Sequence, residues 1–511
     1  MDHPSFHASA QASSDPAPSL LDTSKTKIVV AKTAPSSATC IGLAIGTDGE
    51  LPRELGLDRE ALAAAGFEGK LGDVQVVPQA KGPLLVVFGI GKRGELDVSK
   101  LRDAAALCAR AAGTHEKIAL AVPDLKHLSP ELVAQALVEG AVLARYQYLL
   151  KATAKGPTPL RELTLVSEKA GEELKRGSEL GSVTARATQL ARDLAEAPAT
   201  LLSARRMAEI AEALATECGL DVEVFDEKAL LEMGCGGLLG VNAGSVEPPR
   251  MIKLTYRPKG QATGNVSVVA KGIMFDSGGL GLKPNDLVHA TMKGDMSGAA
   301  AVLAAMTTLR ALDCKNVVTA YLMCTDNMPS GTAMKLGDVL TVRGGKTVEV
   351  INTDAEGRLV MADALVLSTE QNPRPDAIID IATLTGACQR ALGLLTAGVL
   401  GNHQPLVDQV IASGQRTDEQ VWQLPLEKRY RKELDSNLAD LKNVGGENAG
   451  AITAGLFLEE FVDGIPWAHI DIAGTARLDS AETWRPPGAT GFGARLLVDF
   501  LMAFTPPAQV H

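Results

Sequence analysis

The sequence has few aromatic residues, no long hydrophobic run and cysteines in no paired pattern. Only 4% of its 511 residues are aromatic, and its seven cysteines are scattered with no CxxC pair. No apolar run approaches the roughly 18 residues that span a membrane. An odd number of dispersed cysteines argues against a disulfide scaffold and favours a reducing compartment. We therefore expect a cytoplasmic protein without a membrane partner.

Histidine is also scarce, which limits how a metal could be held. None of the eight histidines lies in an HExxH motif, and the one HxxxH pair, His3 and His7, falls in an N-terminal stretch expected to be a disordered tail. Any metal must therefore be bound mainly by oxygen ligands. A net charge of −11 offers no general attraction to phosphate backbones, so nucleic acid is not an expected partner.

The hydrophobic pattern predicts two domains of the same class. Apolar β-branched runs alternate with helix-like stretches on both sides of a segment rich in Ala, Leu, Arg and Glu. This alternation predicts an α/β fold in which each domain has a mixed or mostly parallel sheet flanked by helices, the C-terminal catalytic domain being larger. We expect a disordered tail over 1–24, an N-terminal α/β domain over 25–176, a helical connector over 177–199 and a catalytic domain over 200–511.

Individual elements follow from the same pattern. Apolar strands in a covered sheet carry functional residues at their C-terminal ends and in the loops that follow. We expect strands over 27–31, 74–78, 84–90, 117–123, 266–275, 316–324 and 377–385. We expect helices over 100–112, over 177–215 with a break at Pro198, over 297–312 and after Asp354.

Two glycine-rich stretches imitate nucleotide-binding motifs. Gly89, Gly91 and Gly94 have the GxGxxG spacing after a strand, but no acidic residue ends a second strand about 20 residues later, as a dinucleotide site requires. GGKT at 344–347 resembles the end of a phosphate loop, yet Leu340 replaces the first glycine and a strand is expected to follow. We interpret both stretches as turns.

Ionisable residues interrupt the apolar pattern in 270–284 and 292–301. Lys271 lies within an apolar strand, where burial would favour loss of its proton unless its ammonium reaches solvent at the strand end. Asp276 follows at the end of the strand, and without a role in metal binding it would be a turn residue. Without a functional role, Lys283 would be a solvated loop lysine, and Asp295 would be the N-cap of the next helix.

A third stretch, 350–365, changes the balance between these interpretations. Asp354, Glu356 and Arg358 alternate, and in an extended chain such residues point to one side. If the three stretches converge, four acids meet with too few cations. Two divalent ions would neutralise them, with Lys271 as an uncharged amine ligand, and such a pair supports hydrolysis of an amide or ester. Lys283 would then stabilise an oxyanion, and Arg358 would position an anion or a water.

The same residues carry a resemblance to a known family. NTDAEGRL (352–359) resembles the signature of the leucyl aminopeptidases, also called cytosol aminopeptidases. AKGIMFDSGG, MKGDM, NMPSG, GDVLT and DIATLTGA resemble the surrounding blocks of that family in the same order. The resemblance extends from about Leu194 to Phe500.

This resemblance implies a function and a set of roles. The family consists of aminopeptidases with two divalent ions, Mn²⁺ or Zn²⁺, acting on peptides with Leu-like first residues and assembled as homohexamers. A bicarbonate at the arginine position serves as general base, and the lysine stabilises the gem-diolate. The resemblance assigns metal binding to Lys271, Asp276, Asp295, Asp354 and Glu356, catalysis to Lys283 and Arg358, and substrate binding to Met292, Thr383 and Gly386.

Two alternatives remain open at this stage. A pair of divalent metal ions alone also suits a two-metal phosphoesterase. Few additional Arg or Lys residues surround the motifs, however, which argues against that function. An aminopeptidase fold could also serve a nucleic-acid-binding regulator, which the sequence pI of about 5.4 disfavours.

Overall fold

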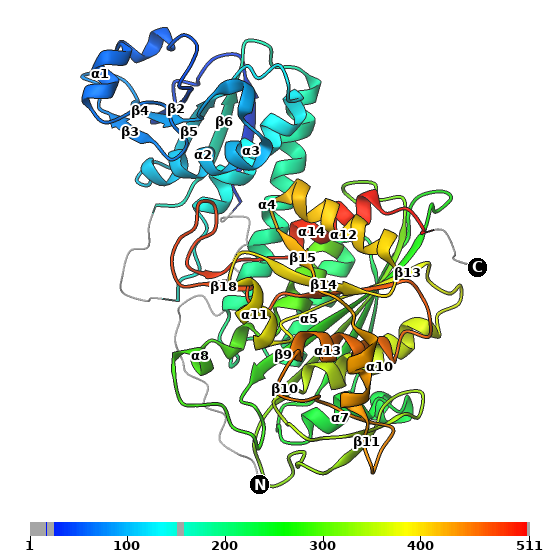
Figure 1. Ribbon diagram of the computed structural model, residues 1–511. Helices are drawn as coiled ribbons and strands as arrows, with labels where there is room; N and C mark the ends of the chain where they lie inside the picture. Colours follow the sequence, from blue (N-terminus) through cyan, green and yellow to red (C-terminus); the bar gives the residue numbers. More distant parts are fainter. Residues whose placement is uncertain (1–16, 18–24, 151–157, 508–511) are drawn as a thin grey trace.

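The computed structural model describes residue 17 and residues 25–150 and 158–507 (Figure 1). Apart from Ala17, the expected tail over 1–24 lies outside the described residues, as do His3 and His7. Figure 1 shows a smaller α/β body built from the N-terminal part of the chain and a larger one built from the rest, with the long helix α4 (Glu172–Glu196) running between them. In the part of the chain that the structure describes, no helix has the length and hydrophobicity needed to cross a membrane.

The smaller body is built on a six-stranded sheet. All neighbouring strands pair in parallel except β3, which pairs antiparallel with β4 at the edge. The strand order is β1 (Lys27–Ala31), β6 (Glu162–Val166), β5 (Lys117–Ala121), β2 (Cys40–Ile45), β4 (Leu84–Gly89) and β3 (Val74–Val77). Its helices are α1 (Arg59–Ala64), α2 (Val98–Ala111) and α3 (Pro130–Ala144), with short 3-10 turns η3 (Arg53–Leu55) and η4 (Arg93–Glu95).

The larger body is built on an eight-stranded mixed sheet. Its centre, β17-β13-β9-β10, is parallel, while β8 and β7 on one side and β14 on the other introduce antiparallel pairs. The order is β15 (Val421–Gln423), β14 (Ala397–Gly401), β17 (Trp467–Asp471), β13 (Ala377–Ala382), β9 (Asn265–Asp276), β10 (Val317–Asn327), β8 (Arg250–Tyr256) and β7 (Asp221–Phe225). Smaller sheets join β11 (Val339–Thr341), β12 (Thr347–Glu349) and β16 (Leu441–Lys442), and β18 (Arg477–Leu478) with β19 (Gly488–Ala489).

Helices cover both faces of this sheet, so the central strands are buried as their composition predicts. They are α5 (Ala204–Cys218), α6 (Glu227–Glu232), α7 (Gly236–Asn242), α8 (Leu287–Ala290), α9 (Ser297–Met306), α10 (Gly357–Thr369), α11 (Gly386–Leu392), α12 (Gln404–Thr417), α13 (Gly450–Glu459) and α14 (Ala494–Ala503). Two 3-10 turns, η5 (Met292–Gly294) and η6 (Lys428–Leu434), complete the set.

The predicted α/β class, with mixed or mostly parallel sheets flanked by helices, is confirmed. Differences lie at element ends. The helix expected to reach residue 312 ends at Met306, where Thr307 and Thr308 turn their hydroxyls onto carbonyls of the preceding turn. Helix α4 begins at Glu172, inside the span assigned to the first domain, so the residue boundaries between the domains stay a prediction.

Both glycine-rich stretches serve as turns. Helix α2 begins at Val98, four positions after Gly94, with Asp97 as its N-cap, so the GxGxxG glycines do not form a helix N-terminus. A Cβ on Gly89 would lie 1.9 Å from the Lys70 carbonyl oxygen, which explains that glycine by packing. Strand β12 begins at Thr347, the last residue of GGKT, and pairs antiparallel with β11, as expected for a hairpin and not for a phosphate loop.

A buried charge network joins the two bodies at Glu139 in α3. Arg102 of α2 and Arg495 of α14 donate to Glu139 Oε2 at 2.7 and 2.8 Å, while Thr184 of α4 and Gln135 donate to Oε1. Burial alone would raise the pKa of Glu139, but the charges of the two arginines outweigh it and lower this pKa to about 2. The network thereby ties α14 of the larger body to the helices of the smaller one.

Replacing Glu139 with glutamine removes the ion-pair partner of both Arg102 and Arg495, whose side chains are buried. We expect E139Q to lower the free energy of unfolding by about 3–5 kcal/mol at pH 7 in urea denaturation. Because the folded pKa lies below its usual value of 4.5, the wild-type advantage is complete above that pH and declines as the pH falls toward about 2. E131Q, which removes an exposed pair on the same helix, is the control, and an equal effect of both variants would contradict the account.

Candidate metal centre

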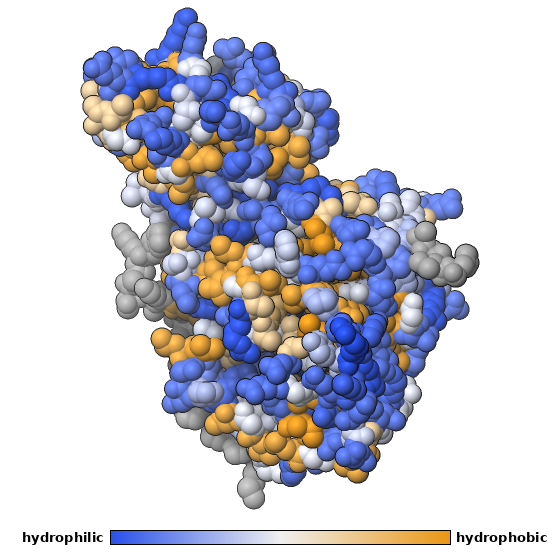
Figure 2. All heavy atoms as spheres, viewed as in Figure 1, coloured by the Kyte–Doolittle hydropathy of each residue, from blue (hydrophilic) through white to orange (hydrophobic). Residues whose placement is uncertain are grey.

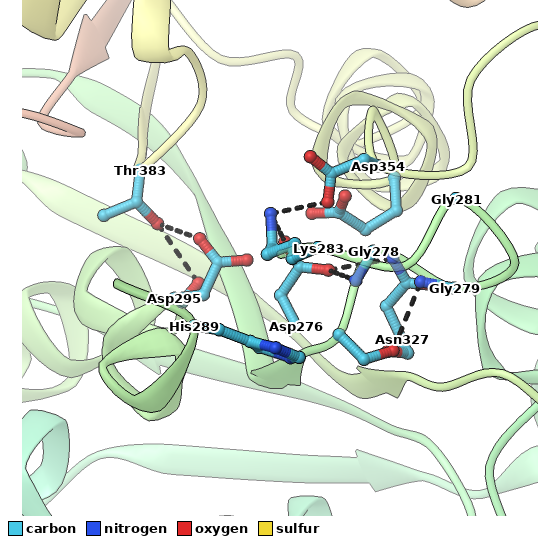
Figure 3. A network of polar contacts seen from close by, with 12 residues as sticks. Asp276, Gly278, Gly279, Gly281, Lys283, His289, Asp295, Asn327, Asp354 and Thr383 are labelled. Carbon is cyan, nitrogen blue, oxygen red and sulfur yellow. Dashed lines mark hydrogen bonds and ion pairs between the residues drawn. The ribbon is translucent and has the colours of Figure 1, made fainter. Parts of the chain in front are cut away.

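The candidate residues converge at the C-terminal end of the larger sheet (Figure 3). Lys271 and Asp276 lie on β9, and Asp276 is its last residue. Asp295 follows the turn η5, while Asp354 and Glu356 precede helix α10. Figure 3 shows the carboxylates of Asp295 and Asp354 approaching the centre from opposite sides, with Lys283 between them. The predicted convergence of the three stretches is therefore present.

Lys271 is buried among acidic groups. Its ammonium nitrogen lies 2.8 Å from both Asp295 Oδ2 and Glu356 Oε1, and it donates to the Thr383 carbonyl oxygen at 2.9 Å. Burial alone would lower the pKa of Lys271, but the charges of Asp295 and Glu356 outweigh it and raise this pKa above its usual value. The expected loss of its proton applies to an unpaired ammonium, whereas here two carboxylates lie beside Lys271, so its role as an uncharged metal ligand stays a prediction. An uncharged Lys271 requires that other cations neutralise the two carboxylates.

Lys283 makes the second contact between a cation and two carboxylates. Its nitrogen lies 2.8 Å from Asp276 Oδ2 and 2.5 Å from Asp354 Oδ1. Burial works to lower the pKa of Lys283, yet Asp276 and Asp354 raise it above its usual value. The side chain is 18% exposed, so a charged ammonium borders the cavity described below.

Asp276 is oriented by its neighbours. Its Oδ1 accepts from the Gly278 backbone N–H and from Asn327 Nδ2, both at 2.9 Å. Gly278 has φ +87°, a conformation that favours glycine and lets the backbone fold back onto the carboxylate. Asn327, at the end of β10, also donates to the Thr353 carbonyl oxygen at 3.0 Å and so fixes the next loop relative to β9.

The alternating arrangement predicted for Asp354, Glu356 and Arg358 is wrong. The segment is a turn, Glu356 has helical dihedral angles at the N-cap of α10, and Arg358 lies in the first helical turn. Asp354 and Glu356 still converge because the turn, and not an extended strand, brings them together. Arg358 is buried, donates to the Asn443 carbonyl oxygen at 2.8 Å and does not line the cavity. Burial lowers the pKa of Arg358 to about 10.

The N-cap interpretation of Asp295 is also wrong. Met296 occupies the cap position of α9, and no side chain caps that helix. The Asp295 carboxylate instead accepts from Thr383 Oγ1 at 2.7 Å, the contact drawn in Figure 3.

The carboxylates retain the bonding capacity that metal ions use. Among the described residues, both oxygens of Glu356, Asp295 Oδ2 and Asp354 Oδ1 are buried without a hydrogen-bond partner, although lysine nitrogens lie close to three of these four atoms. Oxygens of Asp276, Asp354 and Glu356 lie within 4.8 Å of one another. Burial raises the pKa of Glu356 to about 8 and that of Asp295 to about 6. Hard oxygen donors in this arrangement fit divalent cations.

A cavity of about 310 Å³ opens onto these groups. The three residues predicted to bind substrate, Met292, Thr383 and Gly386, all line it together with Lys271 and Lys283. Figure 2 shows hydrophobic side chains gathered over α8 and α11 on this face of the molecule. Exposed large hydrophobic residues here are Leu287 and Val288 of α8, and Leu394 and Leu395 just after α11. The cavity thus combines the ionisable centre with mixed walls, in which apolar residues such as Met292 and Leu384 stand beside polar ones such as Thr385 and Gln389.

Sequence reasoning missed Asn327 because its partners lie 51 and 26 positions away in the chain. The only sequence signal was its position at the end of an apolar strand, where functional residues of such sheets gather.

The fold and this donor set define a metallohydrolase class of site, and comparisons with known proteins specify it. Residues 189–498 match the catalytic domain of the cytosol aminopeptidase family, and residues 52–151 match the N-terminal domain of that family. A relative from Alkaliphilus metalliredigens named "Probable cytosol aminopeptidase" is 40% identical over 87% of this chain and 90% of its own length. A relative from Roseiflexus castenholzii with the same name is 42% identical over 82% of this chain and 87% of its own length.

Solved structures agree with the sequence matches. The bottromycin maturation enzyme BotP in complex with Mn has a TM-score of 0.84 and 36% identity, covering 91% of this chain and 99% of its own. A mutant of tomato leucine aminopeptidase has a TM-score of 0.85 and 29% identity, covering 94% and 97%. The chain belongs to the cytosol aminopeptidase family. It is a metal-dependent aminopeptidase, a metallo-exopeptidase that uses divalent ions.

Asn327 provides a test of the centre that leaves its carboxylates intact. We expect N327L to weaken Mn²⁺ binding about 10- to 100-fold, because the orientation of Asp276 is lost. Isothermal titration of the metal-stripped protein measures the affinity. N437A, at an exposed position, is the control. An N327L affinity equal to that of the wild type would contradict the orienting role.

Proposed function

We propose that this aminopeptidase binds two divalent ions through Lys271, Asp276, Asp295, Asp354 and Glu356 and releases Leu-like first residues from peptides. The observation that carries the proposal is the convergence of buried carboxylate oxygens without hydrogen-bond partners beside a cavity of about 310 Å³. Bound ions would lower the pKa of a water toward neutrality and polarise the scissile carbonyl. Mn²⁺ and Zn²⁺ both suit the donor set, and BotP was solved with Mn.

Lys283 is proposed as the group that stabilises the oxyanion. Its nitrogen borders the cavity beside Asp276 and Asp354, whose charges raise the pKa of Lys283 above its usual value. A fixed ammonium at this point favours the negative charge that develops on the carbonyl oxygen as the gem-diolate forms. Since this interaction is stronger in the transition state than in the ground state, it acts on kcat more than on KM.

Arg358 is proposed to hold a bicarbonate that would supply the general base. Its Nε is buried without a hydrogen-bond partner in the described structure, so the guanidinium has a free donor for an anion. Arg358 does not itself line the cavity, so the proposal requires that the anion reach a site behind the cavity wall.

The preference for Leu-like residues rests on the cavity wall. Met292, Thr383 and Gly386 line it together with Leu384, Ala473 and Ala476, so a Leu-like first side chain would find apolar contacts on this part of the wall. We further propose a cytoplasmic homohexamer, as the resemblance implies. Peptides serve as its substrates.

Removal of the metal tests the activity itself. We expect chelation to abolish hydrolysis of a leucyl anilide and Mn²⁺ or Zn²⁺ to restore it, while E356Q stays inactive after metal is added. Activity that persists in the presence of chelator, or an E356Q variant as active as the wild type, would contradict the two-metal mechanism.

Substitution of Lys283 tests the oxyanion role separately. We expect K283M to lower kcat for the leucyl anilide about 100- to 1000-fold with a much smaller change in KM. K315M, at an exposed ion pair, should match the wild type. A change in KM alone would show that Lys283 contributes only to substrate binding.

A further inference from the structure

One wall of the substrate cavity carries a charged cluster that the proposed mechanism does not use. Arg477 at the start of β18 lines the cavity together with Ala476 and Ala489. Behind this wall lies Glu196, the last residue of the connecting helix α4. Its carboxylate accepts hydrogen bonds from Arg477, from Lys293 and from the backbone of β19.

The cluster is fixed by several contacts. Glu196 Oε1 accepts from the Ala489 backbone N–H at 2.5 Å and from Arg477 Nη1 at 3.1 Å. Lys293 lies 3.1 Å from Glu196 Oε2 and also donates to the Glu196 carbonyl oxygen. Gly488 has φ +98°, and a Cβ there would lie 2.2 Å from Glu196 Oε1, so the backbone closes tightly over the carboxylate. Glu196 is therefore held in place, and Arg477 is anchored to it through Nη1.

The charges of this cluster do not cancel. Two cations, Arg477 and Lys293, face one carboxylate, which leaves one positive charge. Lys293 uses its ammonium on both the side chain and the backbone of Glu196 and does not line the cavity. Arg477 gives Glu196 only Nη1, its Nε is buried without a hydrogen-bond partner in the described structure, and its side chain, which lines the cavity, is 39% exposed. The surplus charge thus faces the cavity through Arg477.

We propose that Arg477 is a specificity-determining residue that binds the side-chain carboxylate of an acidic first residue, so that the enzyme also releases N-terminal Glu and Asp. This inference rests on the proposed function of the same cavity. A leucine side chain needs only the apolar wall around Met292 and Ala476, whereas a glutamate ends in a carboxylate that a guanidinium binds with charge-assisted hydrogen bonds. Lys and Arg first residues meet a like charge and are disfavoured.

Anilides of single amino acids give the cleanest test, because they carry no carboxylate other than that of the side chain. In the metal-loaded wild type we expect kcat/KM for the glutamyl anilide to exceed that for the glutaminyl anilide, a comparison that needs no variant. In R477Q we expect the ratio of kcat/KM for the glutamyl anilide to that for the leucyl anilide to fall about 10- to 100-fold. R374Q, at an exposed ion pair, should leave this ratio unchanged.

The outcomes separate this inference from the proposed function. A wild type without metal-dependent leucyl activity overturns the proposed function. Leucyl activity with no preference for Glu over Gln, or an unchanged ratio in R477Q, overturns only the role of Arg477. If R477Q instead loses activity on the dipeptide Leu-Gly while its anilide ratio is unchanged, Arg477 binds the terminal carboxylate of the substrate and the proposal is wrong. R477E should reverse the preference and raise the ratio of lysyl to leucyl anilide hydrolysis.

Discussion

The repulsion among four closely spaced carboxylates is the constraint on which the catalytic half of this molecule depends. Asp276, Asp295 and Glu356 are almost fully buried, and Asp354 is 34% exposed. Isolated, such groups would be too costly to ionise inside the protein. Lys271 and Lys283 offset that cost in the arrangement seen here, each approaching two of the four acids. Both oxygens of Glu356 are buried without a hydrogen-bond partner among the described residues, so further positive charge would be accommodated beside them.

The surrounding fold serves to hold these groups against their repulsion. Asp276 ends a central parallel strand and is fixed by Asn327 from the neighbouring strand. Asp295 is fixed by Thr383, which follows β13 on the other side. Glu356 stands at the first turn of α10, whose close approach to β9 requires Gly357, because a Cβ there would lie 2.7 Å from the Lys271 side chain. Three adjacent strands and one helix thus converge on a single point, and binding specificity is left to the loops around it.

The sequence predicts the parts of this account that depend on local pattern. The fold class and β9 follow from apolar runs, and the candidate ligands were found because acids interrupt those runs. The geometry within 354–358 was predicted wrongly because a turn and an extended chain can bring the same residues together. Asn327, Glu196 and Arg477 were missed as functional candidates since their roles arise from contacts between distant segments. No sequence pattern marks Arg477, because its role depends on its contact with Glu196, which lies 281 positions away in the chain.

The count of bound metal ions tests the central claim most directly. Equilibrium dialysis of the metal-stripped protein against Mn²⁺, followed by elemental analysis, gives the number of ions per chain without reference to any substrate. The account predicts two ions per chain in the wild type and fewer in E356Q, whose replaced carboxylate lies at the centre of the site. A wild type that saturates at one ion or none would contradict the claim that these carboxylates form a two-metal centre.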